Sequence, residues 1–174
     1  RNRDLIQECR VRSLRNQKVL SLTSKGYSLL KQYGLTDSLS LPEVNLKELN
    51  HDLLVTDIRI QFKGMNLSEW FSERYLFKQN QRRGLPDGAF YVPTKGLLAV
   101  ELELTQKKKS YYYHHFKHLF KEDGTNTFDV CFYFVKGFAL RKLIEKEAVD
   151  FGGLYVGFID EFLQKGYETV LTRG

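Results

Sequence analysis

The sequence predicts an α/β protein with a mixed β-sheet flanked by helices on both faces. The clearest sign is FDVCFYFV, residues 128–135, an almost wholly apolar run of strand-forming residues that is typical of a central strand buried on both faces. Residues 89–92 and 97–104 are two more strand-like runs, and the PTKG between them indicates a hairpin. Apolar residues at helical spacing before, between and after these strands predict the flanking layers.

The first 36 residues are predicted to be a small segment of their own. Residues 19–22 indicate a short strand, Thr23 or Ser24 a helix N-cap, and the residues that follow an amphipathic helix ending at Gly34. The stretch LTSKG resembles the wing strand that leads into the last helix of a winged-helix domain. Residues 1–36 are therefore expected to be an incomplete winged-helix-like segment. A plain strand and helix packed on the main domain is the alternative.

Residues 37–45 are polar, contain Pro42, and predict a linker to a main domain over residues 46–174. A long amphipathic helix is predicted from Leu46 to Gly64, because apolar residues recur there at helical spacing. Residues 68–79 are expected to be helical or partly extended. Beyond the hairpin, the sequence predicts helices over residues 106–121, 137–149 and 161–165 and a strand over residues 154–159.

The composition is that of a folded protein of ordinary size. The chain has 174 residues, of which 42% are hydrophobic, enough for one domain with a real core and a small appendage. No apolar run reaches the about 18 residues of a membrane span, so we expect a soluble cytoplasmic protein without membrane insertion. Cys9 and Cys131 are far apart in the sequence, which argues against a disulfide framework or a cysteine zinc site.

The charge of the chain is concentrated at one end. The formal net charge is +6, and residues 1–36 hold eight Lys and Arg against two acidic residues, whereas the rest of the chain is balanced. A basic segment on a neutral body is typical of a protein that binds a polyanion, and we expect nucleic acid.

Three carboxylates interrupt the predicted sheet. Side chains alternate along a strand, so Glu101 and Glu103 share one face, roughly 7 Å apart, while Leu102 points to the other. Asp87 begins the preceding strand and is expected to lie beside them. Three clustered carboxylates repel one another unless a proton or a cation lies between them, and Mg²⁺ prefers such oxygen ligands. The alternative is a solvated strand face, with the glutamates in water near Lys95 or Lys107.

These residues resemble the motif of the PD-(D/E)xK nuclease superfamily, whose restriction-endonuclease-like core is a mixed sheet with flanking helices. Pro86 and Asp87 match "PD", Glu101 matches "(D/E)", and Glu103 stands where the lysine is expected. In some members an acidic residue occupies that place, and in others the lysine moves to the following helix. Lys107 or Lys108 would then supply the positive charge.

A narrower resemblance covers most of the chain. The segments LTSKG, HDLLVTDIRI, LPDGAF and AVELELTQKKKSYYYHHF, with Trp70 and Glu73, are similar to the replication-relaxation and MobC-type plasmid relaxases. That family implies nicking of one strand at the transfer origin of a mobilisable plasmid, together with other mobilisation or coupling proteins. A non-catalytic DNA-binding accessory factor on the same fold is the alternative. A winged-helix transcription regulator would leave the three carboxylates unexplained.

The resemblance also implies a role for each residue of the site. Asp87, Glu101 and Glu103 would bind Mg²⁺ or Mn²⁺, and Glu103 would also serve as general base. Lys107 or Lys108 would stabilise charge on the phosphate, with Asp57 or Glu73 as an auxiliary ligand. DNA would be held by basic residues on either side of the carboxylates and in the first segment, which are Arg82, Arg83, Lys107, Lys108, Lys109, Arg10, Arg12 and Arg15.

A tyrosine mechanism is a further alternative. Tyr111, Tyr112 and Tyr113 are followed by histidines, and a relaxase of the better-known type attacks DNA with tyrosine beside a histidine-bound metal. His114 and His118 have the helical spacing to share an ion, but the only remaining histidines are their neighbour His115 and the distant His51. Packing, and stacking of an exposed tyrosine on unpaired bases, is the favoured role for these aromatic residues.

Overall fold

The computed structural model describes residues 5–11, 17–33, 48–63, 69–80, 84–93, 96–120 and 128–166. The chain divides into two compact units, Arg1–Asp52 and Leu53–Gly174, which are considered separately. The predicted linker, residues 37–45, lies outside the described residues. In the described part of the chain, no helix combines the length and apolar character required to cross a membrane.

The first unit contains an antiparallel hairpin and a helix: β1 (Ile6–Val11), β2 (Gln17–Leu22) and α1 (Ser24–Gln32). Thr23 is the N-cap of α1, and its hydroxyl accepts a hydrogen bond from the Gly26 N–H at 3.1 Å. The predicted strand and helix are confirmed, whereas β1 was not predicted. Gly26 lies so close to the Leu5 carbonyl that a side chain there would collide with it, so α1 starts directly against the hairpin.

The second unit is built on one open, mixed sheet, as the sequence predicts. The strand order is β3-β4-β5-β6-β7, with antiparallel pairing from β3 to β5 and parallel pairing from β5 to β7. The strands are β3 (Trp70–Ser72), β4 (Gly88–Val92), β5 (Gly96–Glu103), β6 (Val130–Val135) and β7 (Leu154–Phe158). β6 is an interior strand that begins at Val130 and is buried from Cys131 to Val135, which confirms the central strand predicted within residues 128–135.

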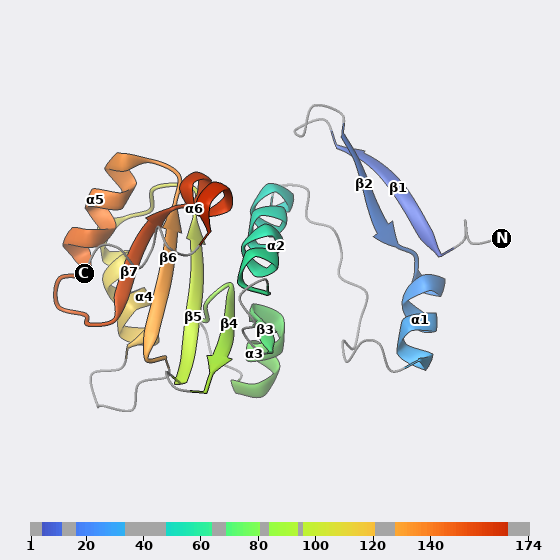
Figure 1. Ribbon diagram of the computed structural model, residues 1–174, viewed down its shortest axis with the longest axis horizontal. Helices are drawn as coiled ribbons and strands as arrows, with labels where there is room; N and C mark the ends of the chain where they lie inside the picture. The colour runs from blue at the N-terminus through green and yellow to red at the C-terminus, as the bar shows by residue number, and fades with distance from the viewer. Residues whose placement is uncertain are drawn as a thin grey trace. The chain divides into compact units, whose positions relative to one another are not determined.

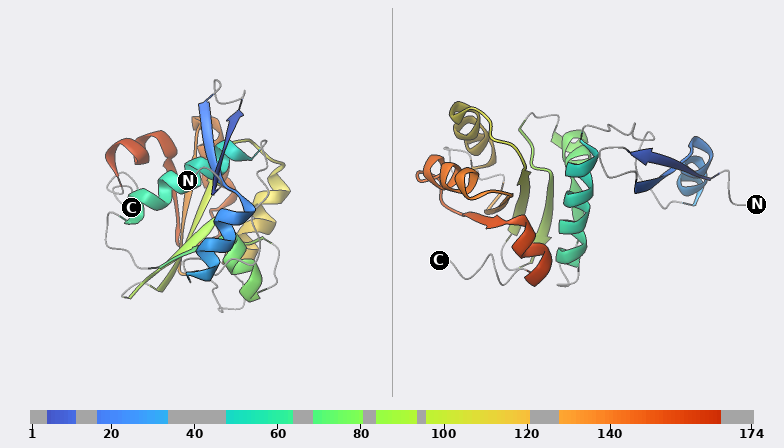
Figure 2. Two further views of the ribbon diagram at one scale, coloured as in Figure 1. Left: turned by 90° about the vertical axis from the view of Figure 1, so that its right-hand side faces the viewer. Right: turned by 90° about the horizontal axis from the view of Figure 1, so that it is seen from above.

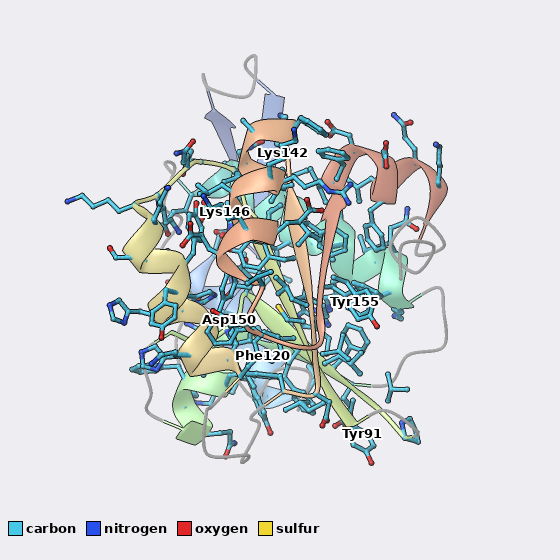
Figure 3. All side chains as sticks on the ribbon, turned by 90° about the vertical axis from the view of Figure 1, so that its left-hand side faces the viewer. Tyr91, Phe120, Lys142, Lys146, Asp150 and Tyr155 are labelled. Atoms are coloured by element: carbon cyan, nitrogen blue, oxygen red, sulfur yellow. The ribbon has the colours of Figure 1, made fainter. Side chains whose placement is uncertain are left out.

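Helices cover both faces of this sheet (Figures 1 and 2). The residues of α2 (Leu49–Lys63) that belong to this unit pack on one face together with α6 (Ile159–Lys165). The other face is covered by α3 (Glu73–Asn80), α4 (Lys109–Leu119) and α5 (Phe138–Glu147). Figure 3 looks onto the α4 and α5 layer, from which Lys142 and Lys146 extend into solvent.

The two faces of the sheet have different cores. The α2 and α6 face is rich in phenylalanine, with Phe62 in ring contact with Phe90, Phe132, Phe134 and Phe162. On the α4 face the strands contribute the small residues Ala89, Ala99 and Cys131 as well as the large Tyr133, and α4 adds Tyr112, Phe116 and Leu119. Cys131 is a free and fully buried thiol. The candidate site lies on this second face.

Residues 68–79 are partly extended and partly helical, which agrees with their prediction, because β3 ends at Ser72, whose hydroxyl accepts the Tyr75 N–H at 3.3 Å and caps α3. One helix differs from its prediction. The helix predicted to begin at Gln106 begins at Lys109, because the Lys107 N–H is bound at 2.9 Å by the Tyr112 hydroxyl. A loop thus separates β5 from α4.

Gly88 is needed for close packing at the start of β4. A Cβ at this position would lie 2.0 Å from Cζ2 of Trp70, so any side chain must displace the indole ring. We therefore expect Gly88→Ala to lower the free energy of unfolding by about 1–3 kcal/mol, as overpacking does. Urea denaturation followed by circular dichroism measures this, with Gly152→Ala as control because nothing lies within 4 Å of its Cβ position. Equal stability of both variants would contradict this packing.

Candidate functional site

Asp87 is fixed beside the end of β5. It directly precedes β4, and its Oδ2 accepts the Leu102 N–H at 2.7 Å, between the two glutamates of the neighbouring strand. Its carbonyl accepts the Glu73 N–H at 3.2 Å, which joins it to the start of α3. The Pro-Asp-Gly segment therefore places its carboxylate at the edge where β5 leaves the sheet, as the sequence predicts.

Glu101 and Glu103 lie on the same face of β5, and that face is covered by α4. Their exposed fractions are 8% and 5%, so the alternative of a solvated strand face is wrong. Tyr112, His115 and Phe116 form the buried side of α4 above them. Burying two carboxylates is costly unless each is paired or protonated, so their surroundings decide what the site can do.

The environment of Glu101 favours the protonated carboxyl. Burial raises its pKa well above the usual value, the negative charge of Asp87 raises it further, and a hydrogen bond with the Asp87 side chain acts in the same direction. The charge of Lys107 opposes these effects, and Glu73 adds a small one in favour. Asp87 and Glu101 are thus a carboxyl pair that needs a proton or a cation between its members.

His115 contacts Glu101 from above. Its Nε2 lies 2.7 Å from Oε1 of Glu101, but the two atoms do not meet the geometry of a hydrogen bond, and within the described ranges both are buried without a hydrogen-bond partner. Burial lowers the pKa of His115 to about 4, and the charge of Lys107 lowers it as well, so the imidazole is neutral at neutral pH. This residue was missed from the sequence, although its helical spacing from Tyr112 and Leu119 places it on the buried face of α4.

Glu103 is paired with Lys107. Lys107 Nζ lies 2.9 Å from Glu103 Oε2, while Oε1 of the same carboxylate accepts the Thr105 N–H at 3.2 Å. Burial acts to lower the pKa of Lys107, but its hydrogen bond and charge interaction with Glu103 outweigh this and raise it. Lys108 is the exposed N-cap residue of α4 and makes no capping hydrogen bond with its side chain. Of the two lysines, Lys107 is the one that reaches the carboxylates.

The three tyrosines have separate surroundings. Tyr112 is fully buried, and its hydroxyl accepts the Lys107 N–H, which fixes the loop after β5. Tyr111 is 41% exposed, stacks on His115, and its hydroxyl lies 3.4 Å from Lys107 Nζ. Tyr113 is exposed and meets Phe151 edge to face. Tyr111 alone of the three is both exposed and next to the carboxylates.

The remaining predicted residues are divided between the site and other places. Glu73 lies near enough to influence Glu101, but Asp57 is exposed on α2, which packs on the opposite face of the sheet through Ile58 and Phe62. His51 is also on α2, with Nδ1 3.7 Å from Asp52. Lys109 is exposed at the start of α4. Outside the described residues lie Arg82, Arg83, Arg12, Arg15 and the side chain of Arg10.

The site can bind a cation only through a small number of protein groups. In the described ranges, no three His, Cys, Asp or Glu side chains are grouped in a way that would hold a metal ion. Two protein donors are nevertheless sufficient for Mg²⁺, which keeps several waters and takes further oxygens from phosphate. The buried atoms Glu101 Oε1 and His115 Nε2, which lack hydrogen-bond partners, are the observation that fits such a cation.

Comparisons of the chain with models of protein families, with curated proteins and with solved structures found no match. Function is therefore inferred from the residues of this chain and their geometry.

Proposed function

We propose that this protein is a metal-dependent DNA endonuclease that nicks one strand of a plasmid at its transfer origin, as a mobilisation relaxase. The observation that carries the proposal is the carboxyl pair of the half-buried Asp87, directly before β4, and the buried Glu101 on the adjacent strand β5, with Lys107 in the loop that follows. These are the positions at which the resemblance to PD-(D/E)xK nucleases requires two acidic residues and a nearby lysine. Such a role would place the protein in the cytoplasm.

The carboxyl pair fits a hard divalent cation. Asp87 and Glu101 would hold Mg²⁺ or Mn²⁺ together with waters and phosphate oxygens, while Glu103, on the same face of β5, is paired with Lys107. A cation there would offset the repulsion and the burial that raise the pKa of Glu101. When bound, the ion would polarise the scissile phosphate and lower the pKa of the attacking water.

Lys107 and Glu103 would act as a pair on the substrate. A phosphate oxygen that accepts a hydrogen bond from Lys107 Nζ would compete with Glu103 Oε2, which now lies 2.9 Å away. Glu103 Oε2 would then be free to accept the proton of the attacking water, and Lys107 would stabilise the charge that develops on the phosphate. The ion pair thus holds Lys107 and Glu103 beside the proposed metal site. Glu103 stands where the family motif has a lysine.

DNA would be held by the basic residues outside this centre. Lys108 and Lys109 are exposed at the N-terminus of α4, where the helix dipole also favours a phosphate. Residues 1–36, which are rich in Lys and Arg and contain a hairpin and a helix, would contact the DNA duplex in the manner of a winged helix. Binding to DNA should then weaken steeply with salt, and other mobilisation or coupling proteins would complete the complex at the origin.

A second candidate function is a non-catalytic DNA-binding accessory protein. The observation that favours it is Glu103, which replaces the expected lysine and neutralises Lys107 through their ion pair. A site that kept this pair closed would bind DNA without cutting it.

The two functions are separated by a nicking assay on supercoiled plasmid that carries the DNA next to the gene of this protein. We expect open circles in the presence of Mg²⁺ or Mn²⁺ and none after addition of EDTA. DNA binding without open circles under either metal would overturn the endonuclease and leave the accessory role.

Lys107 should matter far more than Lys108. We expect Lys107→Ala to slow nicking about 10²-fold, because it removes the charge that stabilises the phosphate, while Lys108→Ala changes the rate less than about threefold. The salt dependence of DNA binding should change by a similar small amount in both variants, since each removes one positive charge. Rates are measured from the conversion of supercoiled to open circular DNA. Equal nicking rates for Lys107→Ala and Lys108→Ala would contradict the proposal that Lys107 acts on the phosphate because it lies beside the carboxylates.

A further inference from the structure

We propose that His115 is a ligand of the divalent cation and that the site therefore prefers a transition-metal ion of the Mn²⁺ class to Mg²⁺. This inference rests on the metal site of the proposed function and adds to it a nitrogen donor that no motif in the sequence indicates. The donors that it requires are Oε1 of Glu101 and Nε2 of His115.

The imidazole of His115 is held in one orientation by aromatic rings. It stacks on Tyr111 with ring centroids 5.6 Å apart and an interplanar angle of 11°, and it meets Tyr133 edge to face at 6.5 Å. Its side chain is only 5% exposed. The ring is therefore fixed beneath α4 with Nε2 directed at β5, which is the preorganisation that a metal ligand needs.

The contact between His115 and Glu101 leaves the hydrogen-bonding capacity of both side chains unused unless a proton or an ion lies between them. Nε2 and Oε1 are 2.7 Å apart, yet they do not form a hydrogen bond, and neither atom has another hydrogen-bond partner among the residues that the structure describes. An unpaired buried polar atom destabilises a protein, so a site with two such atoms face to face is costly as it stands. An ion bound by both atoms would satisfy the two lone pairs together.

The spacing of the two atoms suits neighbouring ligands of one ion. Ligands at about 2.0–2.2 Å from an ion and at right angles to each other are about 3 Å apart. The observed 2.7 Å needs only a small widening to reach that value. The two side chains come from α4 and from β5, which lie against each other, so a small rotation of either side chain provides it.

A nitrogen donor changes which ion the site prefers. Mg²⁺ takes oxygen ligands and gives up its water reluctantly, whereas imidazole suits the transition metals, among which Mn²⁺ also accepts carboxylates. A set of one imidazole and one or two carboxylates therefore favours Mn²⁺ over Mg²⁺. A site made of Asp87, Glu101 and Glu103 alone would show little such preference.

The opposing possibility is that His115 only donates a hydrogen bond to Glu101. The variant His115→Gln separates the two roles, because an amide N–H can donate to the carboxylate but does not replace imidazole as a ligand. His114→Gln is the matched control, since His114 is the neighbouring histidine on the same helix and is exposed.

The test measures binding of Mn²⁺ and of Mg²⁺ to the full chain without DNA, by calorimetry and by the electron paramagnetic resonance of Mn²⁺. We expect Mn²⁺ to bind at least about tenfold more tightly than Mg²⁺ and pulsed spectra to show the modulation of an imidazole nitrogen. His115→Gln should weaken Mn²⁺ binding about 10–100-fold and abolish the nitrogen signal, and His114→Gln should change neither. Circular dichroism confirms that each variant is folded.

Each outcome decides the inference independently of nicking. A wild-type protein that binds Mn²⁺ without nitrogen modulation overturns it, even if the protein cuts DNA. Failure of wild type to bind Mn²⁺, or unchanged Mn²⁺ affinity in folded His115→Gln, overturns it as well. Nitrogen modulation that disappears in His115→Gln supports it, and if no DNA is nicked under the same conditions, only the endonuclease proposal fails.

Discussion

Replacement of Glu101 by Gln should abolish nicking and at the same time stabilise the protein in the absence of metal. The variant loses a carboxylate ligand of the cation, so the rate of nicking is expected to fall about 10³-fold or more. The amide keeps the size of the side chain, has no charge to bury, and its N–H groups can donate to Asp87 or to His115 Nε2. We expect the free energy of unfolding at pH 8, in EDTA, to rise by about 1–2 kcal/mol.

The pH dependence of the free energy of unfolding indicates whether Glu101→Gln raises or lowers stability at a given pH. The pKa of Glu101 is raised in the folded state, so its contribution to stability is present below the ordinary value of 4.5 and is lost as the pH rises toward the folded pKa. His115 has its pKa lowered from 6.5 to about 4, so its contribution is lost as the pH falls through that interval. The two contributions oppose each other below pH 6.5, and the advantage of Glu101→Gln should grow as the pH rises toward the raised pKa of Glu101 in the folded protein.

The control for this experiment is Glu161→Gln. Glu161 is exposed on α6, which covers the other face of the sheet, so both the nicking rate and the stability should stay near those of the wild type. Urea denaturation from pH 5 to pH 9 and the plasmid assay are run on the same preparations. Full nicking by Glu101→Gln would exclude the proposed centre, and a loss of stability at pH 8 would show that the carboxylate is better satisfied than its burial implies.

Phe62→Ala should cause the largest loss of stability. Phe62 is 3% exposed and its ring contacts Phe90, Phe132, Phe134 and Phe162 at centroid distances of 4.7–6.3 Å. Truncation removes one ring from the centre of an aromatic cluster that holds α2 on the sheet. We expect the free energy of unfolding to fall by about 3–5 kcal/mol, measured by urea denaturation.

The matched control for Phe62 lies on the same helix. Ile60 is 62% exposed, so Ile60→Ala should change the stability by less than about 0.5 kcal/mol. If Phe62→Ala costs no more than Ile60→Ala, the ring cluster does not fix α2. Nicking per folded molecule should be unchanged in both variants below the temperature at which they unfold.

The face on which each glutamate lies could be predicted from the sequence, but its burial could not. Alternation along a strand follows from covalent geometry, so Glu101 and Glu103 had to share a face. Whether that face meets water or a helix depends on where the connection between β5 and β6 packs, which the residues of β5 do not encode. The same is true of Lys107, because the direction of its side chain depends on a loop fixed by the Tyr112 hydroxyl.

The elements that were missed or left open are those without a periodic pattern. β3 has only three residues, too few for alternation to be recognised, and it exists because Trp70 pairs with Phe90 on β4. β1 carries charged residues among the apolar ones and becomes a strand through pairing with β2. The long apolar run of β6 needed no such partner to be recognised.

The division of the sheet into a phenylalanine-rich face and a second apolar face that also carries the carboxylates has a consequence for how this protein can change through mutation. Substitutions among the rings around Phe62 alter the tolerance of the fold to heat or to damage elsewhere, while Asp87, Glu101 and His115 stay in place on the other side. During evolution, substitutions on the phenylalanine-rich face can therefore raise stability and offset the stability that is lost when residues of the site are replaced. The strand β5 carries residues of both sides, Leu102 among the phenylalanine rings and Glu101 in the site, so the two kinds of change must be made together there.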